Sequence, residues 1–514
     1  MVAYLNRRYS DFTPSGWGAS GADGVFLLRF PNAYEMRLDE SSFPINWHVV
    51  FEYNHVTTRL WHRSLCWLLP LADLDGGWRV VGRVVGELRS LLEVAETSPS
   101  ILGMNSLDHA IALELRTACT LRAKLAADER LDDAWRADVD AALRTVVAML
   151  ESHARAAGFR LANNHGLMLG LALLHSALVF PDVPRAPEAT QSDVEDLREA
   201  VEVVVDVEGF VFENTPQYQR LYIDILEQLV ELVAALQLQG DSRAHFSARR
   251  DALLDTYRRM LTAERTVPAI GDAPRSKDWV HEPILGTLFS AANGLYVRTE
   301  EQGQLSISCG TRSPVHKQMD DTAVRMALGE VDLILDAGLL SYDSHDPVAS
   351  GVRAQPGHSG LFFTDFDDRP AFWFYPADAP AKVDASMRLE AGTLGDRLTC
   401  RYVVGGVHEA LRVVDVRSVG SLSVTDRCFG PDGAAAVQRF LLPGDMRITV
   451  AGGAVRATTD AADLTLTADE GIRSWCIRRG WSATRPGPPE PCWVLESSVR
   501  GGNAVVTHVE GRQL

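Results

Sequence analysis

The period of the hydrophobic pattern changes once along this chain, near residue 275, and that change constrains the fold more than any other feature. Before it, apolar residues recur at spacings of three and four, as in amphipathic helices. Such segments are 106–126, 131–157, 192–204, 218–239 and 242–264. Ser192 and Glu195 fit a capping box for the third of them. Short connections and the lack of a strand pattern predict an array of helices that curls or closes.

After residue 275 the chain shows short runs that alternate in polarity or are rich in β-branched residues, and many are separated by Gly, Asp or Pro. The runs are 304–309, 323–328, 331–335, 371–375, 398–404, 411–416, 421–428 and 435–442. Several recur at intervals of roughly 8–12 residues, which is typical of an antiparallel sandwich. The turn-rich segment 267–274 predicts a linker. We therefore expect an all-α domain over residues 1–270 and an antiparallel β domain over residues 275–514.

Composition and charge exclude several classes of protein. With 514 residues, 46% of them hydrophobic, the chain can bury enough apolar surface to fold, so disorder over most of its length is excluded. The net charge of −18 argues against general binding to nucleic acid or anionic membranes. An acidic polymer as substrate would need a local basic groove.

Targeting signals and cysteine usage point to one compartment. The first 13 residues contain no apolar stretch of the kind found in secretory signals, and no window approaches 18 uninterrupted apolar residues. The seven cysteines include no CxxC pair, which is typical of thiols in a reducing environment. We expect a cytoplasmic protein without a membrane span.

Common nucleotide and hydrolase signatures are missing: there is no P-loop, no GxGxxG after a strand, no HExxH and no GxSxG. One polar run stands out, Asn163-Asn164-His165-Gly166, directly before an apolar helical segment. Buried amides and imidazoles need hydrogen-bond partners. The run is therefore either a cluster facing a cleft or a helix start with Asn163 or Asn164 as the cap.

A second candidate segment covers residues 208–222 (EGFVFENTPQYQRLY). Tyr218 opens the next helix and Tyr222 lies one turn further on. Tyrosines at such positions are commonly core residues with a solvated hydroxyl, but a phenol can also act as an acid or base if its surroundings lower its pKa. Glu213, in the same loop, is either an exposed carboxylate or part of a site.

The third candidate segment runs from residue 314 to 338. His316, Gln318 and Asp320 alternate, so in a strand they would share one face. Asp336 ends the apolar run 331–335, and His358 lies in the following loop. A carboxylate beside histidines either holds a metal, orients a histidine, or belongs to a hydrogen-bonded turn network.

Together these segments resemble the heparinase II/III-like polysaccharide lyases and their alginate-lyase relatives. The Asn163–Gly166 run looks like the family's Asn-His motif, and Tyr218 sits where the family has its catalytic tyrosine. His316 through Asp320, then Asp336 and Tyr342, look like its HxHxD…DxG…Y signature. The resemblance implies a multi-domain chain, α then β: an N-terminal α/α toroid, an incomplete barrel, followed by a C-terminal antiparallel β-sandwich.

One departure from the family pattern concerns a metal. In relatives that bind a divalent ion, a second histidine, the DxG aspartate and a later histidine supply the ligands. The matching residues here are Gln318, Asp336 and His358. Glutamine is a poor zinc ligand. Zinc, a harder ion such as calcium, or no metal therefore all stay open, and no cofactor is required.

The chemistry that the resemblance implies is β-elimination at a uronic acid. Asn164 and His165 would neutralise the sugar carboxylate, Tyr218 would be the base, and His316 the acid or charge stabiliser. The substrate-binding residues would be Asn163, Tyr222, Glu213 and Tyr342. The partner would be an acidic oligo- or polysaccharide, bound between the toroid and the sandwich.

Two other functions are kept open by the sequence. A glycoside hydrolase on the same scaffold would need two carboxylates flanking a bond, and Asp206, Glu208 and Glu213 lie near the right loop. A non-catalytic protein that binds glycans or assembles exopolysaccharide is the other, because Gln318 departs from the family pattern.

Overall fold

A computed structural model describes most of the chain: residues 17–22, 24–30, 34–47, 55–97, 107–156, 162–336, 338–342, 345–367, 369, 383–393, 395–431, 434–469, 474–485 and 487–514. Two predictions lie outside these residues: the lack of a secretory signal in the first 13 residues and the strand 371–375. The chain forms two compact units. Unit 1 comprises Met1–Val204 and Asp224–Arg249, and unit 2 comprises Val205–Ile223 and Arg250–Leu514.

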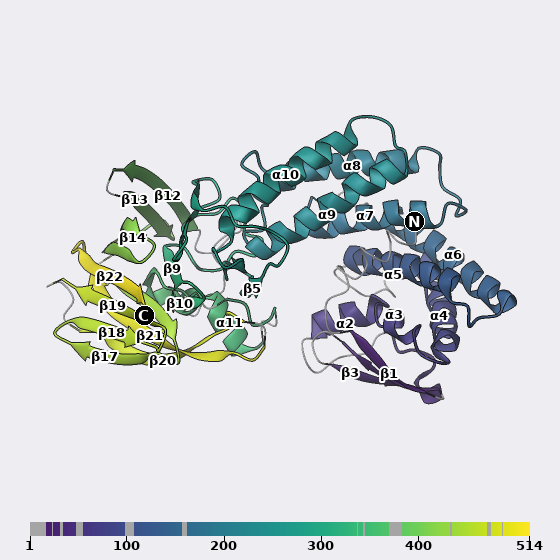
Figure 1. Ribbon diagram of the computed structural model, residues 1–514, viewed down its shortest axis with the longest axis horizontal. Coiled ribbons are helices and arrows are strands. Elements are labelled where there is room, and N and C mark those ends of the chain that lie inside the picture. Colours follow the sequence, from purple (N-terminus) through teal and green to yellow (C-terminus); the bar gives the residue numbers. More distant parts are fainter. Residues whose placement is uncertain are drawn as a thin grey trace. The chain divides into compact units, whose positions relative to one another are not determined.

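Unit 1 is built mainly of helices (Figure 1). Their bounds are α2 His55–Arg63, α3 Leu68–Leu71, α4 Gly77–Thr97, α5 Leu107–Ala127, α6 Asp133–Ala156, α7 Asn164–Val179 and α8 Ala189–Val204. The first part of unit 1 also holds the 3₁₀ turn η1, Glu40–Ser42. Two helices cross from one unit to the other, α9 Pro216–Ala235 and α10 Ser242–Met260. Every helix among the described residues is too short or too polar to cross a lipid bilayer.

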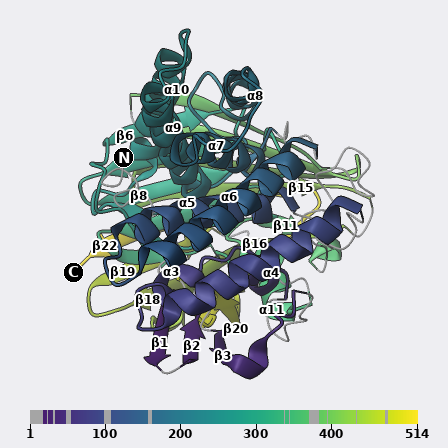
Figure 2. The ribbon, with the colours of Figure 1, turned by 90° about the vertical axis from the view of Figure 1, so that its right-hand side faces the viewer.

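The packing of unit 1 is centred on α7. All of its residues from Gly166 to Ser176 are buried, as expected for a helix that is apolar on nearly every side. It packs on α5 and α8, while α4, α5 and α6 lie side by side (Figure 2). At Gly170 a Cβ atom would come within 2.6 Å of the Leu197 side chain, so glycine permits the close approach of α7 and α8.

The observed N-terminal part differs from the expectation in two ways. A small antiparallel sheet precedes the helices, formed by β1 Gly18–Ala22, β2 Val25–Arg29 and β3 Glu35–Leu38. Phe26 and Leu28 alternate along β2 and are buried. Two alternating residues are too few to predict a strand from the sequence. In addition, α8 begins at Ala189, so the predicted capping box at Ser192 lies inside the helix and is wrong.

Unit 2 is dominated by antiparallel sheets. A five-stranded sheet has the order β10-β9-β8-β7-β6, with β6 Gly286–Ser290, β7 Leu295–Glu300, β8 Gly303–Ser308, β9 Ala323–Leu328 and β10 Val331–Ile334. A four-stranded sheet has the order β11-β16-β21-β20, with β11 Leu361–Phe363, β16 Ala435–Pro443, β20 Cys476–Ser482 and β21 Glu490–Arg500. A two-stranded ribbon pairs β4 Thr266–Val267 with β5 Ser276–Lys277.

The largest sheet has eight strands in the order β12-β13-β14-β15-β22-β19-β18-β17. Their bounds are β12 Val383–Gly392, β13 Gly395–Val404, β14 His408–Ser418, β15 Ser421–Phe429, β17 Arg447–Ala451, β18 Ala454–Thr458, β19 Ala462–Ala468 and β22 Val505–Gln513. The short helical elements in the described part of the unit are α11 Pro347–Arg353, η3 Gln355–Gly357 and η4 Thr364–Phe366. The predicted β runs that the structure describes all fall on strands.

The sheets of unit 2 bury their inner faces against one another. One apolar cluster joins Leu305 and Ile307 of the five-stranded sheet to Leu398 and Val414 of the eight-stranded sheet, with Phe440 of the four-stranded sheet. Along β14 every second residue is buried, as the pleat of a strand requires. This is the sandwich core.

The segment 267–274, predicted as a linker, is instead built into unit 2. Ile270, Asp272 and Ala273 are all buried. A Cβ atom at Gly271, which has a φ of 59°, would lie 3.0 Å from the backbone oxygens of Asn214 and His316. The glycine here allows a tight turn of the backbone and does not indicate a flexible linker. The predicted domain ranges, 1–270 and 275–514, stay predictions.

A buried ion pair lies on the inner face of β14. Arg412 donates to both carboxylate oxygens of Asp426, at 2.8 and 2.7 Å, and also to the backbone oxygens of Thr322 and Ser359. Gln438 donates to the same carboxylate at 2.9 Å. Both charged side chains are fully buried, so each depends on the other.

We predict that Arg412→Met destabilises unit 2 by about 3–5 kcal/mol, because Asp426 is left as an uncompensated buried charge. Arg397→Met is the matched control: its ion pair with Asp415 is exposed and is expected to contribute less than ~1 kcal/mol. Guanidinium unfolding followed by tryptophan fluorescence measures both. Equal midpoints for the two variants would contradict the prediction.

Candidate active site

Tyr218 is positioned by a tight loop and the first turn of α9. Its backbone N–H donates to Thr215 Oγ1 at 3.1 Å, which begins the helix. Gln219 fixes the preceding loop: its side chain accepts from the backbone N–H of Val211 and donates to the backbone oxygen of Gly209. Although Tyr218 lies on a helix, residues 205–223 belong to unit 2 together with the β strands.

His316 lies in a loop and not in a strand. Residues 311–322 form turns between β8 and β9, and His316 has a φ of 54°. The prediction that His316, Gln318 and Asp320 share the face of a strand is therefore wrong. Asn214 Nδ2 donates to the backbone oxygens of Ser313 and Val315, at 2.7 and 2.8 Å. These bonds to neighbouring residues hold the His316 loop against the loop that precedes Tyr218.

Three side chains predicted from the sequence meet in unit 2. The rings of Tyr218 and His316 stack with their centroids 4.0 Å apart and an interplanar angle of 19°. The Tyr342 hydroxyl lies 3.4 Å from the Tyr218 hydroxyl and 3.3 Å from His316 Nδ1. A phenol, an imidazole and a second phenol thus share one hydrogen-bonded cluster.

Asp272 completes the cluster, and the sequence did not single it out. Its buried carboxylate lies 3.2 Å from His316 Nδ1. Arg353 donates to both of its oxygens at 3.1 Å, and Gln318 Nε2 donates to Oδ1 at 2.8 Å. The only sequence signal was an aspartate in a turn-rich stretch, which ordinarily marks an exposed loop. Arg353 carried no signal.

Glu213 and Tyr222 lie beneath this cluster. Tyr222 donates to Glu213 Oε1 at 2.5 Å, and Glu213 Oε2 lies 3.6 Å from His316 Nε2. Both side chains are fully buried. The carboxylate that could have been solvent-exposed is therefore part of the floor of the site. His316 has a buried carboxylate near each of its ring nitrogens.

The surroundings disfavour ionisation of Tyr218. Partial burial, with the negative charges of Glu213 and Asp272, raises the pKa of Tyr218 to about 12, although the hydrogen bond with Tyr342 opposes the shift. Burial and Glu213 raise the pKa of Tyr222 well above its ordinary value. Both phenols are therefore protonated at neutral pH.

The amide and imidazole run is found in unit 1. Asn163 caps α7: its side chain accepts from the backbone N–H of Gly166 at 2.9 Å, which confirms the cap hypothesis. Asn164 and His165 form the first residues of α7 and are half-buried. The His165 ring lies 4.6 Å from that of His109.

Two family models match the chain. Residues 137–288 match the heparinase II/III N-terminus, and residues 287–505 match the heparinase II/III-like C-terminal region. Together they cover most of the sequence. This chain belongs to the heparinase II/III-like family.

Solved structures share the fold of this heparinase II/III-like chain. A heparinase III crystal structure has a TM-score of 0.70 at 12% identity, covering 91% of this chain and 79% of that one. The heparan sulfate lyase HepC from Pedobacter heparinus has a TM-score of 0.64 at 14% identity, covering 100% and 88%. The fold is thus an N-terminal α/α toroid followed by an antiparallel β-sandwich. No curated protein sequence matches this one.

The residues at the family's metal position are bonded to other protein groups. Asp336 uses one oxygen for His358 Nδ1 and the other for the Arg325 guanidinium. Gln318 directs its amide N–H groups to Asp272 and to the backbone oxygen of Gly338. Among the described residues no group of three or more His, Cys, Asp or Glu side chains is arranged to hold a metal. The Arg325 guanidinium beside Asp336 disfavours a divalent ion at this place, whereas the buried Nε2 atom of His358 finds no hydrogen-bond partner among the described residues.

We predict that a chelator leaves the melting temperature of the protein unchanged and that purified protein carries only substoichiometric metal by mass spectrometry. By contrast, Arg325→Met should destabilise unit 2 by about 3 kcal/mol, since Asp336 loses its buried cationic partner. One bound zinc or calcium per chain, with a chelator-sensitive melting temperature, would show that the donor set can rearrange around an ion.

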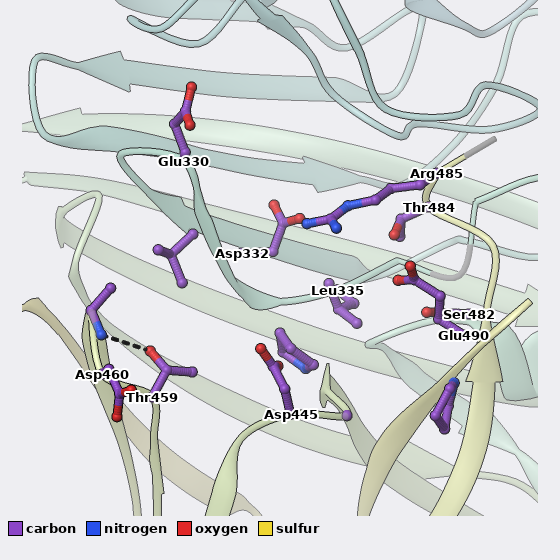
Figure 3. A pocket seen from close by; sticks show the side chains of 15 residues that line it. Glu330, Asp332, Leu335, Asp445, Thr459, Asp460, Ser482, Thr484, Arg485 and Glu490 are labelled. Atoms are coloured by element: carbon purple, nitrogen blue, oxygen red, sulfur yellow. Dashed lines mark hydrogen bonds between the residues drawn. The ribbon is translucent and has the colours of Figure 1, made fainter. Parts of the chain in front are cut away.

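A separate cavity in unit 2 does not share its lining with the predicted site. Figure 3 shows this space of about 800 Å³, lined by strand ends and turns of the sandwich. Its carboxylates are those of Glu330, Asp332, Asp445, Asp460 and Glu490, with Arg485 beside them. Glu330, Asp332 and Asp460 are paired with Lys277, Arg275 and Arg447, and the lining contains none of the residues predicted for a uronate site.

Proposed function

We propose that this chain is a polysaccharide lyase that cleaves a glycan containing uronic acid by β-elimination. Its family membership and its fold support this assignment, as does the name of one structural neighbour, a heparan sulfate lyase. The observation that carries the proposal is the stack of Tyr218 on His316, with Tyr342 bonded to both.

The cluster has the groups that β-elimination requires. The proton at C5 of a uronate is weakly acidic, so its removal needs a base, an acid for the departing O4, and donors that stabilise charge on the carboxylate. A phenol held beside an imidazole can both take and return a proton. We assign the base to Tyr218, which also returns the proton to O4.

The remaining roles follow the family resemblance. Asn164 and His165 donate hydrogen bonds to the sugar carboxylate, and Asn163 fixes the helix start on which they stand. His316 stabilises charge beside Tyr218. Glu213 and Tyr222, being fully buried, act by supporting His316 and not by touching the sugar. The substrate is an acidic oligo- or polysaccharide; nucleic acid is disfavoured by the net charge of −18.

The hydrolase alternative is weakened by how its candidate carboxylates are bonded. Asp206 accepts from the backbone N–H groups of Glu208 and Phe210 and from Asn293. Glu208 accepts from Ser290, and Glu213 from Tyr222. All three hold the loop before α9. A hydrolase needs two carboxylates on either side of a sugar bond. These three carboxylates instead accept hydrogen bonds from other groups of the protein.

We predict that Tyr218→Phe lowers turnover by roughly 10²–10⁴-fold or more, because the group that moves the proton is removed. Ultraviolet absorbance of the unsaturated product, on a panel of uronate oligosaccharides, measures it. Tyr296→Phe is the control; it removes a phenol bonded to a carboxylate, Asp396, elsewhere in unit 2.

Three other outcomes identify other functions. Saturated products would favour the hydrolase. Sugar binding without any product would favour the non-catalytic protein. Wild-type turnover in Tyr218→Phe would show that the base is another group.

A further inference from the structure

The Tyr342 hydroxyl occupies a bridging position. It lies between the Tyr218 hydroxyl, at 3.4 Å, and His316 Nδ1, at 3.3 Å. Because a hydroxyl both donates and accepts, it can accept from Tyr218 and donate to His316 at once. Substrate binding alone does not require this pair of contacts.

The other partner of His316 Nδ1 is Asp272, at 3.2 Å. A ring nitrogen without hydrogen can accept from Tyr342; a ring nitrogen with hydrogen can donate to Asp272, and it cannot do both. The two arrangements differ by one proton on Nδ1. Nδ1 of His316 therefore has Tyr342 as its partner before it gains a proton and Asp272 as its partner afterwards.

We propose that Tyr342 and His316 form a proton relay that ionises Tyr218 for catalysis, and this inference rests on the proposed lyase function. The Tyr218 proton passes to the Tyr342 oxygen while the Tyr342 proton passes to His316 Nδ1. The products are a Tyr218 phenolate and a cationic imidazole ring; no electrons are gained or lost. The phenolate then takes the C5 proton of the sugar and delivers it to O4, which regenerates the Tyr218 phenolate beside the cationic ring, and return of the two protons through Tyr342 restores the neutral pair.

Charged groups around the ring favour this transfer. Asp272 lies beside Nδ1 and Glu213 lies 3.6 Å from Nε2, so both carboxylates attract the cation that forms. Arg353 and Gln318 hold Asp272 in place and keep it from rotating away. The cationic ring then lies flat against the Tyr218 ring, where it attracts the phenolate.

A direct route for ionising Tyr218 is unfavourable in comparison. Without a relay the phenol must lose its proton to water, and burial with the nearby carboxylates raises its pKa to about 12. With the relay, the total charge of Tyr218 and His316 stays zero, because the positive charge on the imidazole forms next to the negative charge on the phenolate.

The test is Tyr342→Phe in the full chain, assayed on the oligosaccharide that gives the fastest wild-type turnover. We expect kcat to fall at least about tenfold while KM stays within about twofold. We also expect the rate of the variant to keep rising into alkaline pH, where the wild-type profile has levelled off, because Tyr218 must then ionise unaided. Tyr296→Phe should match wild type in kcat and in pH profile.

A double-mutant cycle with Asp272→Asn tests whether the groups act as one unit. Asp272 is a positioning residue, so its variant should lower kcat, and the double variant should be about as slow as the slower single one. Asp278→Asn is the control, because Asp278 forms a comparable pair with His281 at 2.9 Å outside the cluster. Additive losses would overturn the relay.

The failures of the two proposals are distinguishable. An active wild type with a raised KM, an unchanged kcat and an unchanged pH profile in Tyr342→Phe would show that Tyr342 only binds substrate, and would overturn the relay alone. A wild type that forms no unsaturated product on any uronate oligosaccharide would overturn the lyase function and the relay with it.

Discussion

The carboxylate of Asp272 is the contact on which the geometry of the candidate site depends. A buried carboxylate costs several kcal/mol unless its oxygens are bonded, and here they are bonded by Arg353 and Gln318, with His316 Nδ1 beside them. These partners come from the end of α11 and from the loop between β8 and β9. One charge therefore ties separate segments together and sets the orientation of the imidazole.

The loop before α9 extends this arrangement to the phenol of Tyr218. Asn214 donates to the backbone oxygens of Ser313 and Val315. Gln219, in the first turn of α9, accepts from the backbone N–H of Val211 in the loop. Tyr218 is thereby held over His316 by contacts within unit 2. The negative charges below, on Glu213 and Asp272, keep Tyr218 protonated at rest. The same charges become favourable once the imidazole gains a proton, which makes the site suited to a transient ion pair.

A second buried network lies beside the first and includes the residues that the family resemblance assigned to a metal. Gln318 faces Asp272 through its amide, and Asp336 pairs with Arg325 and His358. Lys317 adds a further buried cation, bonded to Asp320. Arg325 and Lys317 thus supply positive charge to two buried carboxylates in this part of the sandwich. Gln318 joins the two networks, because its amide donates to Asp272 and to the backbone oxygen of Gly338.

The sequence by itself determined the order of helices and strands, since period 3.6 and period 2 are local properties of the chain. The family motif also singled out Tyr218, His316 and Tyr342, which the structure brings into one cluster, and the sequence narrowed the cap of α7 to Asn163 or Asn164. It could not identify Asp272 or Arg353, whose meaning depends on contacts between residues about 80 positions apart. Nor could it show that residues 267–274 are buried, because glycine and proline mark tight turns and flexible linkers alike. Only tertiary structure brings a helix, two loops and α11 around one imidazole, and burial there decides which carboxylates face solvent and which set the charge of the site.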